Sequence, residues 1–496
     1  MVMLTPIRPN YDQVYLFPPV LEDWISADHP ARFVRDFVAS LDLVSLGFSP
    51  AVPASTGRPP YDTGMLLSAW LYGYLERIRS SRQMERATFN HLGVIWLTGN
   101  LHPDHNTLSN FLRDHRTAFK KLFSNLVRVA AKLELVGMLV HALDGTKIAA
   151  QCSKRGAWHR ENLKKTLALL DETVETLLAQ TEQADTDELG ETALPRELTD
   201  AQSRREQILS ALTTLEEEQT DHLQPRETEA RMIKGGDGRT VFSYNAQAVV
   251  DASSGLVVAA DVVPDAADNA LLPPMLDQVE ATLGSTAEMS LADGGYQSGE
   301  SFAKLEEQGR EVLVNLESYS ERAASAYTKE HFCWQPEANQ YVCPHGQALP
   351  WVRRKTKKHK RDGSPYWVDI FRCGACADCP ARSDCTTSKT GRSIERNEYD
   401  DAFQRQRLKQ RDPDARFLLK WRGAIIERVF GQIKQGMGFR RWTVAGLEAV
   451  QAQWALICTT INLKRFIQWW STGQLDMERM RIAFRVIAQA EIRSAR

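Results

Sequence analysis

Two aspartates stand at the ends of short apolar runs, and a glycine follows each of them. Asp144 precedes Gly145, and Asp293 precedes Gly294. Each run is typical of a buried strand, and the glycine lets the backbone turn away, which leaves the carboxylate room for a ligand. A carboxylate in such a place must be solvated by water or by a cation. If the two strands are neighbours, a divalent cation between the carboxylates would offset their repulsion.

A third carboxylate would complete such a site, and Glu427 is the best candidate. It lies in an amphipathic helix whose apolar stripe consists of Ile426, Val429, Phe430 and Ile433. Helical geometry puts Lys434 two turns beyond Glu427, on nearly the same face. Spacing alone leaves an alternative open, in which the aspartates cap helices and Glu427 is an ordinary surface residue.

The cysteines predict a metal site of a different kind. Five of the eight are close together in the sequence: Cys343, Cys373, Cys376, Cys379 and Cys385. So few cysteines in a long chain argue against a disulfide scaffold, whereas four thiolates can bind one tetrahedral Zn²⁺. We expect a structural zinc ion held by four of these five cysteines. Free buried thiols are the alternative.

Cationic residues flank both the cysteines and the helix of Glu427. A dense run within the cysteine-rich segment contains Arg353, Arg354, Lys355, Lys357 and Lys358. A second basic tract leads past Glu427 and includes Arg422, Arg440 and Arg441. Charge runs are usually solvated surface, but in an enzyme that acts on nucleic acid they bind the phosphate backbone. If the acids form the site of such an enzyme, these residues and Lys434 would bind DNA.

The length and composition of the chain limit the class of protein that can position these residues. A chain of 496 residues with 43% hydrophobic and 25% charged residues is ordinary globular protein of several folding units. No run approaches the roughly 20 apolar residues of a membrane span, and residues 1–15 lack the features of a signal peptide. We expect a cytoplasmic protein with no membrane partner. The formal net charge is only −2, because an acidic helical stretch cancels the charge of the basic tracts.

Hydrophobic periodicity divides the chain into five parts and predicts an α/β fold. Residues 1–135 are expected to form an all-α DNA-binding domain, although a plain helical bundle fits the pattern equally well. Strands and helices alternate over residues 136–157 and 231–330, as in a mixed sheet. The remaining parts are an acidic helical-hairpin insertion (158–230), a cysteine-rich basic module (331–395) and a carboxyl-terminal helical part with Glu427 (396–496).

Several motifs together resemble the DDE transposases of bacterial insertion sequences. In the expected order they are a helical amino-terminal unit, Asp144–Lys147, Tyr244–Gln247, Ala292–Tyr296, Trp421–Trp442 and Trp454–Lys464. Each motif alone is weak, but jointly they extend over most of the chain. The resemblance implies a ribonuclease-H-like core in which Asp144, Asp293 and Glu427 match the family's three metal-binding acids.

The resemblance also implies a reaction and its partners. Such an enzyme binds the terminal inverted repeats of its element in double-stranded DNA, cuts there and joins the ends to target DNA. Two Mg²⁺ (or Mn²⁺) ions on carboxylates activate the attacking oxygen and stabilise the leaving one in an in-line phosphoryl transfer. Because two DNA ends must be brought together, we expect a homodimer, associated with the bacterial nucleoid.

The pattern around the third acid departs from that of the family. Lys434 matches the family's lysine, but Gly423 stands where an arginine usually lies four residues before the glutamate, and Lys420 stands at the usual tyrosine position. Arg422 is the candidate replacement for the arginine. Two alternative functions stay open: a nuclease or resolvase that performs no strand transfer, and a domesticated DNA-binding protein.

Overall fold

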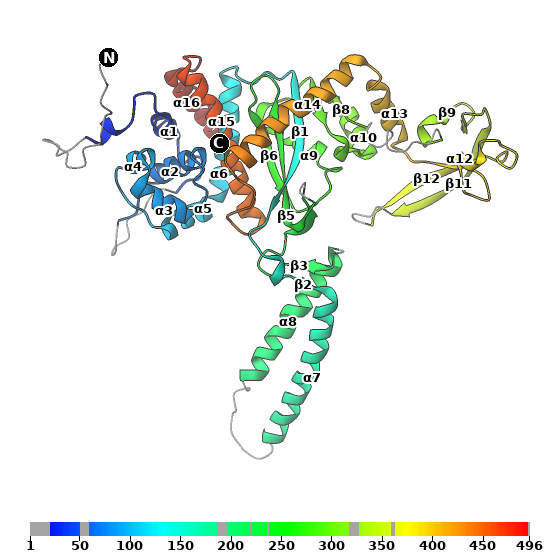
Figure 1. Ribbon diagram of the computed structural model, residues 1–496, viewed down its shortest axis with the longest axis horizontal. Coiled ribbons are helices and arrows are strands. Elements are labelled where there is room, and N and C mark those ends of the chain that lie inside the picture. Colours follow the sequence, from blue (N-terminus) through cyan, green and yellow to red (C-terminus); the bar gives the residue numbers. More distant parts are fainter. Residues whose placement is uncertain are drawn as a thin grey trace, which may run out of the picture. The chain divides into compact units, whose positions relative to one another are not determined.

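The computed structural model describes residues 20–49, 59–185, 196–218, 220–235, 238–316, 327–358 and 363–494. The chain packs into two units: residues 1–133 with 432–496 form the first, and residues 134–431 form the second. Figure 1 shows their helices and strands. Residues 1–15, in which the sequence predicts no signal peptide, lie outside the described part. No helix of the described residues is long and apolar enough to cross a membrane.

The first unit is built from helices. They are α1 (Pro30–Ala39), α2 (Thr63–Leu75), α3 (Ser81–Asn90), α4 (Leu92–Leu97), α5 (His105–Asp114), α6 (Arg116–Lys132), α15 (Leu447–Ser471) and α16 (Met477–Ser494). Aspartate or serine side chains cap α2, α3 and α5 by accepting backbone N–H groups of the first turn. α15 packs against α2 and α6, and the rings of Trp70 and Trp454 are fully buried.

A six-stranded mixed sheet forms the centre of the second unit, which confirms the predicted mixed α/β architecture. Its strands are β1 (Val140–Ala149), β4 (Arg231–Lys234), β5 (Thr240–Asp251), β6 (Val257–Val263), β7 (Met289–Ala292) and β8 (Val312–Val314). β1 lies between β5 and β7, antiparallel to the first and parallel to the second. β8 extends the parallel side beyond β7, and β6 and β4 both pair with the other edge of β5.

Helices cover this sheet and connect its strands. They are α9 (Leu272–Leu283), α10 (Gly299–Glu307), α13 (Asp400–Lys409) and α14 (Pro413–Gly431). α14 contacts β1, β5, β7 and β8, so it lies across the sheet, as Figure 1 shows. Its buried side chains, Ile425, Ile426, Val429 and Phe430, recur at helical spacing and form the face that contacts the strands.

Two long helices between β1 and β5 form an antiparallel pair. α7 (Arg160–Asp185) and α8 (Arg196–Glu217) contact each other, and the short strands β2 (Trp158–His159) and β3 (His222–Leu223) pair at their base. A small apolar cluster holds the pair together and contains Leu163, Ile208, Leu212, Leu215 and Leu223. Helix pairs of this kind are stabilised by the apolar stripe between them.

A second, antiparallel sheet follows β8 in the chain. It consists of β9 (Cys333–Gln335), β10 (Gln340–Val342), β11 (Ala348–Lys358), β12 (Pro365–Arg372) and β13 (Ser393–Arg396), in the order β13-β12-β11-β10-β9. Its core is formed by Tyr341, Leu349, Phe371 and Ile394 with Cys373 and Cys376. The short helix α12 (Arg382–Cys385) precedes β13.

Candidate active site

The register of β1 and β7 brings Asp144 and Asp293 side by side. The two strands run parallel with Ala142 opposite Leu291, so two residues further along Asp144 is level with Asp293. Neighbouring strands lie about 4.8 Å apart. The condition that the sequence sets, that the two aspartate-bearing strands are neighbours, is therefore met. These two carboxylates are called the acid pair below.

Asp144 carries the electrostatic signature of this neighbourhood. Burial, followed by the charge of Asp293, raises the pKa of the Asp144 carboxyl above its ordinary value. Arg422 opposes the shift, because its Nη1 lies 3.1 Å from Asp144 Oδ2. The backbone N–H of Gly145 donates to Oδ1 over 2.7 Å. Negative charge thus gathers at this point of the sheet, and a guanidinium offsets part of it.

Asp293 caps a turn and also faces Asp144. It precedes the 3-10 turn η3 (Gly294–Tyr296), and its Oδ1 accepts the N–H of Gly295 over 2.8 Å. Asp293 therefore acts as a cap, as the alternative interpretation of the sequence predicts, and it also belongs to the acid pair. Tyr296 ends the turn in full burial, and burial together with the charges of Asp268, Asp144 and Asp293 raises its pKa. Its hydroxyl is thus a protonated donor.

Glu427 lies on α14, the helix that crosses β1 and β7. The predicted apolar stripe is confirmed, since Ile426, Val429, Phe430 and Ile433 are all buried. Glu427 itself is exposed. A Cβ added at Gly423 would lie 3.4 Å from Glu427 Oε1, so the carboxylate folds back along its own helix by one turn.

The three acids do not form one metal-ready cluster. Across the described ranges of the chain, no group of three or more His, Cys, Asp or Glu side chains has the arrangement that would hold a metal ion. Asp144 and Asp293 come together, and α14 brings Glu427 to the same sheet. The predicted magnesium and zinc sites therefore stay predictions.

A fourth carboxylate, Asp268, lies beside the acid pair and is not among the residues that the sequence singles out. Its oxygens accept hydrogen bonds from Lys147 at 3.1 Å, from Asn245 Nδ2 at 2.6 Å and from Gln247 Nε2 at 2.8 Å. A usable signal exists in the sequence of β5. Asn245 and Gln247 carry polar amides two residues apart on one face of the strand, and both are buried, so a polar partner must lie on that face.

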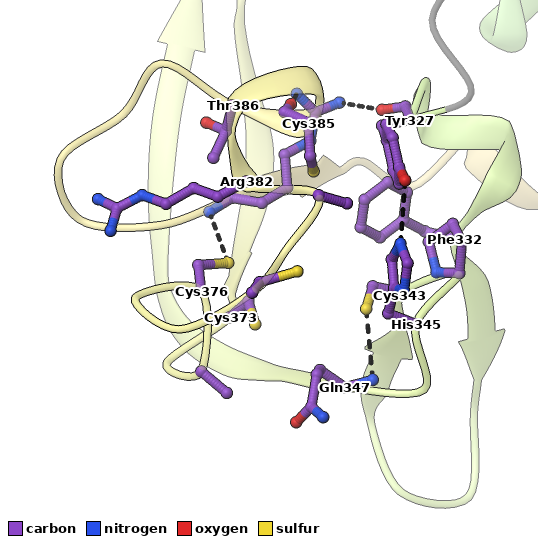
Figure 2. Close-up of a pocket in the computed structure, with 15 residues that line it drawn as sticks. Tyr327, Phe332, Cys343, His345, Gln347, Cys373, Cys376, Arg382, Cys385 and Thr386 are labelled. Atoms are coloured by element: carbon purple, nitrogen blue, oxygen red, sulfur yellow. Dashed lines mark hydrogen bonds between the residues drawn. The ribbon is translucent and has the colours of Figure 1, made fainter.

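The five clustered cysteines line one pocket on the second sheet, which we call the cysteine pocket. Cys343, Cys373, Cys376, Cys379 and Cys385 all contribute to its wall. Figure 2 shows the sulfur atoms of Cys373 and Cys376 across the pocket from that of Cys343. None of the eight cysteines, all within the described part, forms a disulfide. Burial and the neighbouring Cys376 raise the pKa of Cys373 to about 11, so this thiol is protonated at neutral pH.

Two sulfur atoms of the cysteine pocket accept backbone N–H groups. The N–H of Gln347 donates to Cys343 Sγ over 3.3 Å, and that of Arg392 donates to Cys376 Sγ over 3.4 Å. In both cases the preceding residue is a glycine with positive φ, Gly346 at 76° and Gly391 at 92°. Only glycine adopts this conformation at no steric cost. The chain thus turns twice in a way that directs an amide toward sulfur.

Strands β11 and β12 form a long hairpin that carries the first basic run, and we call it the basic hairpin. Arg354 binds both oxygens of Asp369, at 2.9 and 2.8 Å. Lys355 and Lys357 both bind the carboxylate of Glu395 on β13. Arg353 and Lys358 are exposed, and neither makes an ion pair with a described residue. Trp351 and Trp367 are also exposed, at 47% and 56%.

The remaining predicted DNA-binding residues lie in different settings. Arg422 binds Asp144 of the acid pair. Lys434 lies in the π-helical turn η5 (Gln432–Gly436). Arg440 and Arg441 are exposed between the buried rings of Phe439 and Trp442, whose edge-to-face contact fixes this part of the first unit.

Two segments of the chain match known protein families. Residues 19–114, which contain α1 to α5, match a family described as "Transposase domain (DUF772)". Residues 342–467, from the end of β10 through most of α15, match a family described as "Transposase DDE domain". The second segment includes Glu427 and all five cysteines of the cysteine pocket, whereas Asp144 and Asp293 lie outside both. No curated protein and no solved structure matches the chain.

Proposed function

The two family matches identify the chain as an insertion-sequence DDE transposase, and from this premise we propose its reaction. The enzyme binds the terminal inverted repeats of its element in double-stranded DNA, cuts at their ends and joins the freed ends to target DNA. The observation that carries this proposal is the acid pair, in which Asp144 lies on β1 and Asp293 directly follows the adjacent parallel strand β7.

We infer that the six-stranded sheet is a ribonuclease-H-like core. The strand order β6-β5-β1-β7-β8 supports this inference, because two antiparallel pairings lead into two parallel ones. The central strand carries the first acid, and its parallel neighbour leads directly into the second. α14 packs across the same strands and carries Glu427.

Mg²⁺ or Mn²⁺ is the proposed cofactor. Carboxylate oxygens are the hard ligands that these ions prefer, and burial together with the charge of Asp293 raises the pKa of Asp144, a cost of ionisation that a divalent cation would offset. Two such ions would supply activation of the attacking oxygen and stabilisation of the leaving oxygen. Asp144, Asp293 and Glu427 are the residues that would hold them.

One set of residues serves both chemical steps. Water attacks the phosphorus in cleavage and the 3′-oxygen leaves; in joining, that 3′-hydroxyl attacks a target phosphate and a target oxygen leaves. Asp144 and Asp293 keep two carboxylates at a spacing that the strands fix. Arg422, which pairs with Asp144, offers a planar guanidinium to a phosphate oxygen close to the acid pair.

DNA contacts are assigned to exposed cations on several elements. The basic hairpin presents Arg353 and Lys358 to solvent, and Arg440 and Arg441 are exposed in the first unit. Such contacts bind the phosphate backbone without reading its sequence. The helical segment 19–114 is the candidate for recognising the inverted repeats. Synapsis of two DNA ends would require two copies of the chain. The proposed place of this reaction is the bacterial nucleoid in the cytoplasm.

The cysteine pocket is proposed to hold one structural Zn²⁺. Its five sulfur atoms exceed the four ligands of a tetrahedral site. The amides of Gln347 and Arg392, directed at Cys343 and Cys376, would stabilise thiolates in the way that outer partners of zinc ligands do. Cys373, Cys376 and Cys343 with Cys379 or Cys385 are the expected ligands.

An assay with purified protein, labelled inverted-repeat ends, Mg²⁺ and a plasmid target tests the proposed function. We expect both cut donor ends and joined product, each dependent on the divalent ion. Donor nicking without joined product would instead indicate a nuclease or resolvase. Binding of the ends with neither product would indicate a DNA-binding protein that has lost its activity.

A further inference from the structure

A polar network, half-buried at Asp268 and Lys147 and buried at its two amides, connects β1 with the turn that Asp293 caps. Asp268 is at its centre and accepts from Lys147, Asn245 and Gln247. Gln247 Oε1 in turn accepts a hydrogen bond from the hydroxyl of Tyr296. The network therefore runs from β1 through β5 and the β6–α9 loop to the turn that follows β7.

In the side-chain amides of Asn245 and Gln247, each nitrogen donates to an oxygen and each oxygen accepts a hydrogen bond. Asn245 Nδ2 donates to Asp268 and to the carbonyl of Asp265, and Asn245 Oδ1 accepts from Gln247 Nε2 at 2.8 Å. Gln247 Nε2 donates its second proton to Asp268. A carboxylate accepts and cannot donate, so Asp268 fixes which end of each amide faces it. Gln247 is left with its oxygen directed at Tyr296.

Close packing leaves this network little freedom. Asn245, Gln247 and Tyr296 are at most 1% exposed. Gly145 lies opposite Gln247 in the sheet, and a Cβ at Gly145 would stand 2.2 Å from Gln247 Nε2. The glycine after the first acid is thus required because the amide of Gln247 occupies the space of a side chain.

Tyr296 connects the network to Asp293, the second acid. It is the last residue of η3, the turn that Asp293 caps. Its hydroxyl binds the strand residue opposite Gly145, which is the immediate neighbour of Asp144. One hydrogen bond therefore connects the turn of one acid to the strand of the other.

We propose that Tyr296 is a positioning residue that, through Gln247 and Asp268, sets the spacing between the carboxylates of Asp144 and Asp293. The inference rests on the proposed function, because the spacing matters only if the acid pair binds divalent ions. Partners that orient metal ligands are worth about 10-fold to 100-fold in metal affinity. Tyr296 does not touch the reacting atoms in this scheme.

Titration of the whole chain with Mn²⁺, followed by calorimetry, tests the proposal. We expect Tyr296→Phe to bind Mn²⁺ about 10-fold to 100-fold more weakly, with unchanged affinity for inverted-repeat DNA. Tyr74→Phe is the matched control, because its buried hydroxyl also binds a glutamine, Gln453 Nε2 at 2.7 Å, in the first unit. This control should lose stability and keep wild-type Mn²⁺ affinity.

Two further variants, Asp268→Asn and Asp293→Asn, distinguish failure of the positioning role from failure of the proposed function. Asp268→Asn should weaken Mn²⁺ binding in the same direction, and combining it with Tyr296→Phe should add little, because both act through Gln247. Wild-type Mn²⁺ affinity in Tyr296→Phe, with binding lost in Asp293→Asn, would overturn the positioning role alone. Absence of Mn²⁺ binding by the wild-type chain would instead overturn the proposed function.

Discussion

The acid pair and the cysteine pocket both gather groups of one kind, but the protein treats them differently. The acid pair has built-in counterparts: the guanidinium of Arg422, the N–H groups of Gly145 and Gly295, and the network beside it. The cysteine pocket has two amide donors and an apolar core. Burial keeps Cys373 protonated, whereas Asp144 retains a cation partner.

Under the proposed function, this difference separates a site that exchanges ions from one that keeps an ion. Because protein groups already hold the acid pair, a bound ion could leave it without loss of the fold. In the cysteine pocket a zinc ion would replace the proton of Cys373, whose pKa burial and Cys376 raise to about 11, so metal binding there would be coupled to folding. The comparison leads to three predictions, from the largest expected effect to the smallest.

Removal of zinc should have the largest effect. Zinc bound to thiolate sites is worth on the order of 10 kcal/mol of folding free energy, so a strong chelator should release zinc and unfold the second sheet. Thermal unfolding and metal analysis before and after chelation measure this. A mild chelator that removes only Mg²⁺ is the control and should leave the melting temperature almost unchanged.

The result that would break the comparison is equally clear. Active protein that contains no zinc, with unchanged melting temperature after treatment with the strong chelator, would show that the cysteine pocket holds free buried thiols. The two regions would then differ only in their ligands and not in their relation to the fold.

Charge changes on the basic hairpin should affect DNA binding to an intermediate degree. Lys355→Ala with Lys357→Ala removes two cations, so the slope of log affinity against log salt should fall by about two. Glu395→Gln frees the same two lysines from their shared carboxylate and should tighten binding. Fluorescence anisotropy over a salt series measures both.

Lys409→Ala is the matched control for these variants, because Lys409 is also ion-paired, with Glu311 at 2.6 Å, but lies on α13. It should leave the salt dependence unchanged. An unaltered slope in the double lysine variant would remove Lys355 and Lys357 from the DNA-binding surface. Arg353 and Lys358 would then be the remaining candidate contacts of the basic hairpin.

The pH dependence of stability should show the smallest effect and reports on the acid pair. The pKa of Asp144 is raised above 3.8, so the stability that its protonated form contributes is present below pH 3.8 and is lost as pH rises through the raised value. Asn does not ionise. The melting temperature of Asp144→Asn relative to the wild type should therefore rise by a few degrees over this range.

Addition of Mg²⁺ at neutral pH sharpens the same experiment. It should stabilise the wild type and not Asp144→Asn, because ligand binding to the folded state stabilises it. A difference in melting temperature that does not change with pH would show that burial and the charge of Asp293 do not raise the pKa of Asp144.

Local pattern was sufficient to predict the parts of this site that depend on one segment at a time. Glycine after an apolar run predicted the positions of Asp144 and Asp293, and helical spacing predicted the buried stripe beside Glu427. The register of β1 and β7 then places the two aspartates level with each other. Apart from the pairing of β1 with β7, each of these steps depends only on the sequence of one segment.

The contacts that the sequence did not predict all join distant segments. Asp268 meets Lys147, Asn245 and Gln247 only after β1, β5 and the β6–α9 loop are in register. Arg422 faces Asp144 across 278 positions of sequence. The charge run of the basic hairpin likewise gave no sign that Glu395 neutralises Lys355 and Lys357, because that carboxylate comes from another strand.

Strand joining by acid-pair variants is the measurement that tests the central claim most directly. Inverted-repeat ends and a plasmid target are incubated with Mg²⁺ and wild-type protein, Asp293→Asn, or the paired control Asp261→Asn on β6. We predict that Asp293→Asn still binds the ends but forms at least about 1000-fold less joined product, while Asp261→Asn joins like the wild type. Joined product from Asp293→Asn at the wild-type rate would contradict the claim that the acid pair is the catalytic site.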